Sequence, residues 1–377
     1  MAHVAEEIRW YKETVPGEKP LAPDNFLLRS ADGYTVQETE NSEEIIPIGA
    51  SGEPGGKAYG ASTYGGNVDM TLVGDMFPML AHHAIGEATT KDDAATDTWA
   101  GTTVQAVGDL VNHSDGTHTL YCQTAGTTGS TEPDITSLNE YQTVNDGTVT
   151  WVVRDKLISY KGKRESCLDT FGLELKLAGS CSGGSDVFER VGGCYINTVE
   201  FGKSAGDISL KASIAILGMN MDSSVTNPSY PPQDGSDAEL SSEYIGNCDL
   251  DVYIDGVQMA NLTSLKAPIN RNITMDQTLI CGENISNIGN LSIAGTVEGL
   301  FTEELYGWGV DKSQHELKLV YTHKGDLMEL TFPRIVFDKN PIGVVTQKSA
   351  TISGGFTAIG DKTQSAVSYK VVSRIDY

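Results

Sequence analysis

Apolar and polar residues alternate along much of the chain, with the two-residue period of a β-strand. The segment GGNVDMTLVGD (65–75) sets valine, methionine and leucine against Asp69 and Asp75. A related segment, GNLSIAGTVEG, occupies 289–299, and DISLKASIAI (207–216) alternates in the same way. Each pattern predicts a strand with one face toward a core and the other toward water.

Turns rich in glycine, asparagine, aspartate and serine separate these strands, which is typical of an all-β protein. One or two short helices are expected, at 76–86 (MFPMLAHHAIG) and 300–309 (LFTEELYGWG). Adjacent helical residues point to different faces, so His82 and His83 do not form a metal-binding pair. We interpret these two histidines as a solvated helix end.

Changes in composition along the chain predict its domain organisation. Residues 91–155 are rich in threonine, glycine and aspartate and have closely spaced turns, which indicates a small Ig-like β module inserted into a larger unit. The predicted parts are an N-terminal arm (1–60), a first half (61–90 and 156–222), the insert (91–155), a linker (223–237) and a second half (238–377). The arm has little periodic pattern: it is either a disordered tail or a segment that orders against a neighbouring subunit through Trp10, Tyr11 and Phe26.

Two segments of equal length, 174–218 and 316–360, resemble each other. Both begin with ELKL, continue through a turn and two strands, and end at a glycine. A strand that begins with Gly-Asn and a short helix precede each segment. This order predicts a duplication, in which one chain supplies two sectors of a closed ring without exposed sheet edges.

Three duplicated chains would form a ring with pseudo-sixfold symmetry. If each half contributes about four strands, the ring is a β-barrel of about 24 strands and about 50 Å backbone diameter, for strands about 4.8 Å apart and tilted about 40°. Side chains cannot fill such a barrel, and a nucleic-acid duplex fits inside it, so its inner face is expected to be wet. A ring of six chains is the alternative, and it would contradict the duplication argument.

The formal net charge of −25 disfavours tight binding to nucleic acid, although solubility alone also explains it. No apolar run approaches the roughly 18 residues of a membrane helix, so no membrane insertion is expected. The six cysteines include no C-x-x-C pair, and G-x-S-x-G, H-E-x-x-H and P-loop motifs are absent from the sequence. We therefore expect no catalytic residues, no metal and no cofactor.

Three segments, 66–86, 190–219 and 244–309, resemble tail tube proteins of bacteriophages with long, non-contractile tails (siphophages). The insert separately resembles small β modules of phage tail and fibre proteins, some of which bind carbohydrate. The resemblance implies a duplicated tail-tube β-sandwich or barrel fold, assembled as homotrimeric or hexameric rings that stack around a lumen. The implied partners are a tape-measure protein, tail tip and terminator proteins, and double-stranded DNA that passes without tight binding. The implied location is the virion, after assembly in the host cytoplasm.

A conduit for DNA should avoid basic contacts with phosphate, because such contacts release counterions and bind tightly. The carboxylates expected on the lumen face are those of Asp69, Asp75, Glu200, Asp207 and Glu298. The alternative is that they lie on the outer surface and only maintain solubility.

A glycan- or receptor-binding adhesin is the alternative function, and it depends on the insert. The aromatic residues that could stack on sugar rings are Trp99, Tyr121 and Trp151. In so small a domain, two tryptophans are more often part of the core.

Overall fold

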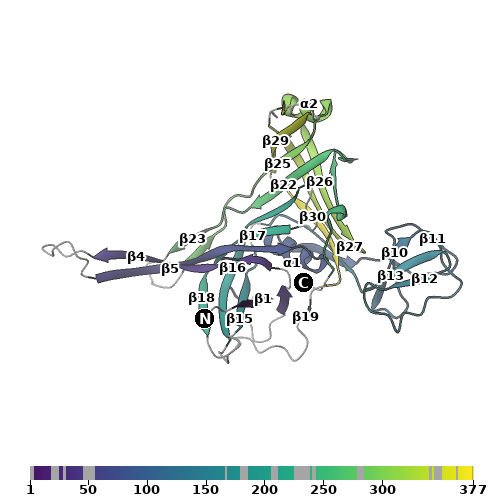
Figure 1. The fold of residues 1–377 in the computed structure, drawn as a ribbon, viewed down its shortest axis with the longest axis horizontal. Helices are drawn as coiled ribbons and strands as arrows, with labels where there is room; N and C mark the ends of the chain where they lie inside the picture. Colours follow the sequence, from purple (N-terminus) through teal and green to yellow (C-terminus); the bar gives the residue numbers. More distant parts are fainter. Residues whose placement is uncertain are drawn as a thin grey trace.

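Strands dominate the computed structural model, and most of them belong to one large curled sheet (Figure 1). The β4–β5 hairpin extends to one side of the molecule, and the small sheet that contains β10 and β13 extends to the opposite side. The prediction of an all-β chain with short helices is confirmed. The structure describes residues 4–17, 25–28, 31–45, 56–165, 168–178, 186–204, 211–224, 238–239, 243–277, 284–338, 342–343, 350–361, 364–375 and 377.

In the first half, the strands pair in the order β1–β15–β16–β17–β5, and β3 and β4 run along the far edge of β5. All of these pairings are antiparallel. The strands are β1 (Val4–Lys12), β3 (Ala31–Tyr34), β4 (Gln37–Ile45), β5 (Gly56–Thr71), β15 (Phe171–Ala178), β16 (Val187–Ser204) and β17 (Lys211–Gly218).

The second half repeats this arrangement in the order β20–β26–β27–β29–β25–β22. The two ELKL segments lie in β15 and β26, so the resemblance in sequence coincides with an equivalent place in the two sheets. The strands are β20 (Leu250–Ile254), β22 (Leu262–Asn270), β25 (Ser292–Leu300), β26 (Gln314–His323), β27 (Asp326–Phe337) and β29 (Thr351–Ala358).

The two halves are joined because the C-terminal part of β16 pairs with β17 on one side and with β22 on the other. In the first half, β17 and β18 (Asn220–Ser224) pair with successive parts of β16. In the second half, β29 and β30 (Ser368–Ser373) pair with successive parts of β27 in the same way. β14 (Ile158–Lys163) pairs with β30 and with β6 (Ala88–Asp93). The remaining strands of the body are β2 (Asn25–Leu28), β19 (Ala238–Glu239), β21 (Val257–Gln258), β23 (Thr274–Gln277), β24 (Asn284–Asn287) and β28 (Ile342–Gly343).

Each half has one α-helix, placed between the strands β5 and β15 or β25 and β26. The helix α1 (Phe77–Ala84) follows the 3₁₀ turn η1 (Gly74–Met76), and all of its residues are buried. The helix α2 (Glu303–Asp311) begins after Thr302, whose hydroxyl accepts a hydrogen bond from the Leu305 amide. A second 3₁₀ turn, η2 (Asn247–Asp249), precedes β20.

The interpretation of His82 and His83 as a solvated helix end is wrong. Both imidazoles are buried, because the two halves of the chain cover α1 from both sides. The Nδ1 of His83 lies 3.0 Å from the carbonyl oxygen of Asp169, and its Nε2 contacts the hydroxyl of Tyr377. Burial lowers the pKa of His83 well below its ordinary value, and neighbouring His82 and Lys12 act in the same direction.

The structure also corrects part of the expected arm. Residues 4–12 form β1, which pairs with β15 of the same chain, and β2 pairs with β1. Trp10 stacks on Phe171 with the ring centroids 3.7 Å apart. Ile8 and Trp10 therefore belong to the main core, and the glutamates between the apolar residues of this strand concealed its alternation.

The insert has its own sheet and its own small core. Its strands pair in the order β12–β13–β10–β9–β7, and β8 pairs with β11. Leu120, Trp151 and Val153 belong to its hydrophobic cluster. The strands are β7 (Asp97–Thr98), β8 (Val104–Gln105), β9 (Leu110–Asn112), β10 (His118–Thr124), β11 (Gly126–Thr127), β12 (Thr143–Asp146) and β13 (Val149–Asp155).

Candidate functional site: the exposed face of the joined sheet

One continuous row of strands crosses both halves, in the order β4–β5–β17–β16–β22–β25–β29–β27. Alternation within these strands separates two faces: in β25 the odd-numbered residues from Ile293 to Gly299 are buried and the even-numbered residues are exposed. The buried face is apolar and includes Val68, Ile214, Val199 and Ile269. The opposite face therefore meets solvent in a single copy of the chain.

The exposed face carries small polar side chains and a few charges. Asp69, Ser213 and Glu200 stand opposite one another on β5, β17 and β16, so they form one row across the sheet. The Ser213 hydroxyl donates to the Asp69 carboxylate at 2.6 Å. The ammonium of Lys266 lies 3.3 Å from the Glu200 carboxylate, and both of these side chains are exposed.

The second half continues this face through β25 and β29. Glu298 stands opposite Ser264 on one side and Ser353 on the other. The Ser353 hydroxyl donates to the Glu298 carboxylate at 3.4 Å. A serine therefore stands beside each of these three carboxylates. Among the side chains described on this face, Lys266 and Arg334 are basic, and the Arg334 guanidinium lies 2.7 Å from the Asp361 carboxylate.

The structure thus brings three of the five predicted carboxylates, Asp69, Glu200 and Glu298, onto one solvent-exposed face. Asp207 lies outside the described residues. Asp75 does not belong to this face: its side chain is fully buried, and its carboxylate lies 2.9 Å from the guanidinium of Arg374. The prediction that Asp75 meets water is wrong, because it follows the strand β5 and enters η1 beneath the insert.

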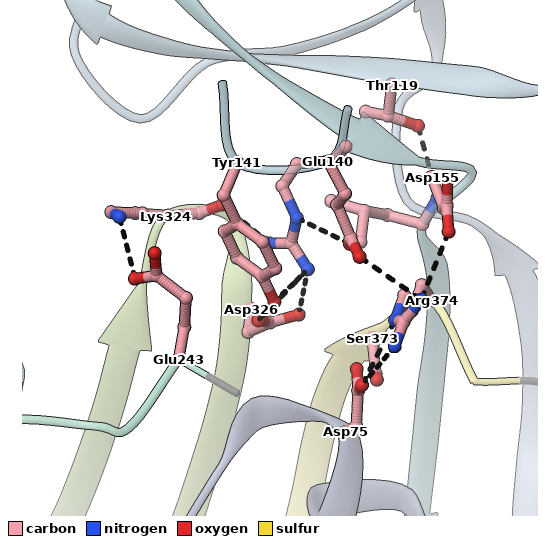
Figure 2. A network of polar contacts seen from close by, with 12 residues as sticks. Asp75, Thr119, Glu140, Tyr141, Asp155, Glu243, Lys324, Asp326, Ser373 and Arg374 are labelled. Carbon is pink, nitrogen blue, oxygen red and sulfur yellow. Dashed lines mark hydrogen bonds and ion pairs between the residues drawn. The ribbon is translucent and has the colours of Figure 1, made fainter. Parts of the chain in front are cut away.

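Asp75 belongs to a buried network that fixes the insert to the body (Figure 2). Arg154 of β13 donates to Asp326 of β27 at 2.9 and 3.1 Å, and to the carbonyl oxygen of Lys324 at 2.6 Å. Glu140 of the insert lies 3.1 Å from Arg154 and 3.1 Å from Arg374. Burial opposes the charge of Arg154, but Asp326, Tyr141 and Glu140 raise the pKa of its guanidinium above the ordinary value.

Sequence reasoning did not find this network. Arg154 and Asp326 are separated by 172 residues, and Arg374 and Asp75 by 299. Neither pair has a local motif, and a charged residue in an acidic chain is usually solvated. A signal does exist in β13, where Arg154 directly follows the apolar run Trp151, Val152 and Val153.

The aromatic residues expected to contact a glycan are mostly core residues of the insert. Trp151 is fully buried, so it cannot stack on a sugar in this structure. The indole N–H groups of Trp99 and Trp151 both donate to the Asp146 carboxylate, at 2.8 and 3.1 Å. Tyr121 is half-buried. The alternative reading of the two tryptophans as core is the one that the structure favours.

A hollow of about 220 Å³ lies beside α1 and is lined by Lys12, His82, Lys91 and three tyrosines, among other residues. The tyrosine hydroxyls are already engaged within the chain. Tyr160 donates to the carbonyl of Ile375, and Tyr369 donates to the carbonyl of Gly86. We therefore attribute this hollow to the docking of the last strand on α1.

Among the described residues, no three or more histidine, cysteine, aspartate or glutamate side chains are grouped so that they could hold a metal ion. In the same part of the chain, no helix has the length and apolar character needed to cross a membrane.

A family model for phage tail tube proteins matches residues 6–362, nearly the whole chain, including the insert and both halves. The chain belongs to the phage tail tube protein family. Comparison with curated proteins gives no match. As a tail tube protein, the chain is a structural component of the virion that self-assembles into a stacked tube, and the family gives it no enzymatic role.

Proposed function

We propose that three copies of this tail tube protein close into a ring, and that the exposed face of the joined sheet lines the lumen through which double-stranded DNA leaves the virion. The observation that carries the proposal is the row of eight strands, four from each half, with one apolar and one polar face. Three copies supply about 24 strands, enough for a barrel about 50 Å wide.

The edges of this row support ring closure. Within the part of the chain that the structure describes, β3 and β4 pair only with β5, so their outer edge has no partner strand. In the second half, β22 occupies the equivalent position, and its outer edge pairs with β16 of the first half. In the ring, β27 of one copy takes the place of β16, and its C-terminal end meets β3 and β4 of the next copy.

The lumen chemistry follows from the charges on the face. Asp69 and Glu298 repel phosphate, and serine and threonine offer only weak, exchangeable hydrogen bonds. Lys266 and Arg334 add little attraction because Glu200 and Asp361 neutralise them locally. DNA therefore slides without the counterion release that accompanies tight binding.

Electron microscopy of tubes formed by the purified protein tests the ring proposal. The expected result is stacked rings with three chains in each. Six chains per ring, or a lumen lined by another face, would overturn it.

Charge reversal tests the lumen. Tubes of the double variant Asp69→Lys and Glu298→Lys are expected to assemble normally, but phages that carry them should eject DNA more slowly at low salt. The double variant Asp92→Lys and Asp97→Lys, at two exposed positions of β6 and β7, makes the same change in charge and is the matched control. Equal ejection rates for all three phages would contradict the lumen assignment.

We also propose that the insert is an outward decoration and that the tape-measure, tail tip and terminator proteins meet the tube but not the insert. β6 and β14 lie side by side at the base of the insert, with Ile158 opposite Asp93. Residues 95–156 can therefore be replaced by an Asn-Gly turn, together with Asp326→Asn because the deletion removes Arg154. The shortened protein should still form tubes, whereas loss of assembly would refute the decoration role.

A further inference from the structure

The helices α1 and α2 occupy equivalent places in the two halves but have different surroundings. Val68 of β5 pairs with Ile214, and Gly295 of β25 pairs with Phe356. Ile214 and Phe356 hold the same position in the two repeated segments, 174–218 and 316–360, so Val68 and Gly295 are equivalent. His83 in α1 and Val310 in α2 each lie 15 residues after these positions and are compared on that basis. His83 is 1% exposed, whereas Val310 is 51% exposed.

The second half covers α1 within the same chain. Phe77 of α1 packs on Tyr321 of β26, with the ring centroids 6.1 Å apart. The strand β30 contacts α1 directly, and its Val371 is fully buried. The sheet β26–β27–β30 of one half is therefore the seat for the helix of the other half.

Among the described residues, α2 packs mainly on β27 and β29 of its own half: Trp308 stacks on Phe337 of β27, with the centroids 5.6 Å apart. Its outer side stays open in a single copy, and apolar side chains surround it. Those that are exposed are Leu300 at the end of β25, Val310 on α2 and Ile359 after β29.

The first half contains an equivalent seat, and the end of it that carries Met221 and Leu177 is incompletely covered. The sheet β15–β16–β18 corresponds to β26–β27–β30, because β18 continues β17 along β16 as β30 continues β29 along β27. Met221 of β18 pairs with Val191, on the same face of the sheet as Leu173 and Trp10, which are already buried within the chain. Met221 is only half-buried, in contrast to Val371 of β30.

We propose that α2 of one copy docks on the β15–β16–β18 sheet of the next copy, in the way that α1 docks on β26–β27–β30 within the chain. This inference rests on the ring of the proposed function and names two of its contact surfaces. The contact is head-to-tail, so each copy uses one helix and one seat, and three copies close the ring. The exposed apolar residues around α2 become buried on assembly, as the residues of α1 already are.

Substitution of each surface with lysine tests the docking. Val310→Lys and, separately, Met221→Lys should raise the protein concentration needed for half-assembly by at least about tenfold, because each buries a charge in an apolar contact. Val104→Lys, a change at an 81% exposed valine in the insert, should assemble as the wild type does. The melting temperature of each unassembled variant shows whether its chain is still folded.

A mixture of the two variants makes the test specific for a head-to-tail contact. The intact α2 of the Met221→Lys chain can dock on the intact seat of the Val310→Lys chain, but the complex then cannot grow. Sedimentation should show monomers for each variant alone and two-chain complexes for the mixture. If Val310→Lys forms tubes at the wild-type concentration, or if the folded variants do not pair when mixed, the docking inference is overturned while the ring proposal stands. If the wild-type protein forms no rings, the proposed function fails first.

Discussion

The two helices of this protein show how much the same structural unit depends on what lies next to it. The helices α1 and α2 follow equivalent strands and precede equivalent ELKL strands. Every residue of α1 is buried, whereas α2 keeps exposed residues on its outer side. The difference comes from the position of each half in the chain: the first half has a neighbour within the same molecule, and the helix of the second half faces outward.

This comparison explains why the two copies differ in sequence although their strands pair alike. The helix α1 can contain Phe77, Met79 and Leu80 because they never meet solvent. The helix α2 contains Glu303, two glycines and Asp311, a composition compatible with exposure before assembly. A duplicated chain thus uses one type of helix–sheet contact twice. The contact of α1 forms within the chain, and the proposed contact of α2 forms only on assembly.

The largest loss of stability is expected from the buried network around Arg154 and Asp326, which joins the insert to the sheet that packs on α1. Arg154→Ala leaves the buried Asp326 without its ion-pair partner, whereas Glu140 keeps Arg374, so the free energy of unfolding should fall by about 3–5 kcal/mol. Chemical denaturation of the unassembled chain measures the loss. Hydrogen exchange should rise in β14 and α1, which lie beyond the network. Lys266→Ala breaks an exposed ion pair and should cost less than about 1 kcal/mol. Similar losses for both variants would show that the network does not support the body.

The second effect concerns the helix itself. Leu80 is fully buried, so Leu80→Ala should lower the free energy of unfolding by about 2–5 kcal/mol. Leu300→Ala makes the same chemical change at a leucine that is 44% exposed, just before α2, and should cost under about 1 kcal/mol in the free chain. The two leucines are compared by denaturation below the concentration of assembly. Equal costs would mean that α2 is covered within the chain.

Sequence alone predicted the parts of this fold that depend on local pattern. The alternation in 65–75 and 289–299 correctly indicated strands with one apolar face, and the paired ELKL segments indicated two similar halves. Asp69 and Glu298 were placed on exposed strand faces because their apolar neighbours fixed the phase. For these residues, the chain within a few positions contains the necessary information.

The errors concern residues whose environment comes from distant segments. Asp75 looked solvated because its partner Arg374 comes from the far end of the chain. His83 looked like a helix end because nothing nearby in sequence reveals that Tyr377 and Phe171 cover it. Trp10 was assigned to an arm, although it stacks on Phe171, 161 residues later. Burial of a charged or aromatic side chain is a property of the tertiary contact, which local pattern does not encode.

A smaller effect is expected from pH, again at α1. The His83 Nδ1–H donates to a carbonyl, so its Nε2 accepts from the Tyr377 hydroxyl, and this arrangement needs a neutral ring. Because burial lowers the pKa of His83 below that of the unfolded chain, unfolding takes up a proton at acid pH. The stabilisation is complete above about pH 6.5 and is lost as the pH falls, with a slope of at most about 1.4 kcal/mol per pH unit.

Thermal unfolding between about pH 7 and pH 5 measures this slope. The His83→Gln chain keeps a donor and an acceptor in place but does not titrate in this range, so its slope should be shallower than that of the wild type. Burial and Lys12 also lower the pKa of His82, although the Asp169 carboxylate 2.9 Å away opposes this shift, so part of the slope should remain in His83→Gln. A wild-type slope retained in His83→Gln would assign the acid sensitivity to other groups.

The smallest effect on the free chain is expected at the position in α2 that corresponds to His83. Val310→Ala removes two methyl groups from a half-exposed side chain and should change the free energy of unfolding by less than about 0.5 kcal/mol. The same change should weaken tube formation measurably, because the methyl groups are buried only when α2 meets the next copy. Denaturation of the free chain and light scattering of the assembling protein separate the two readouts. A loss in the free chain as large as that of Leu80→Ala would show that α2 already has its cover, and the contrast between the two helices would disappear.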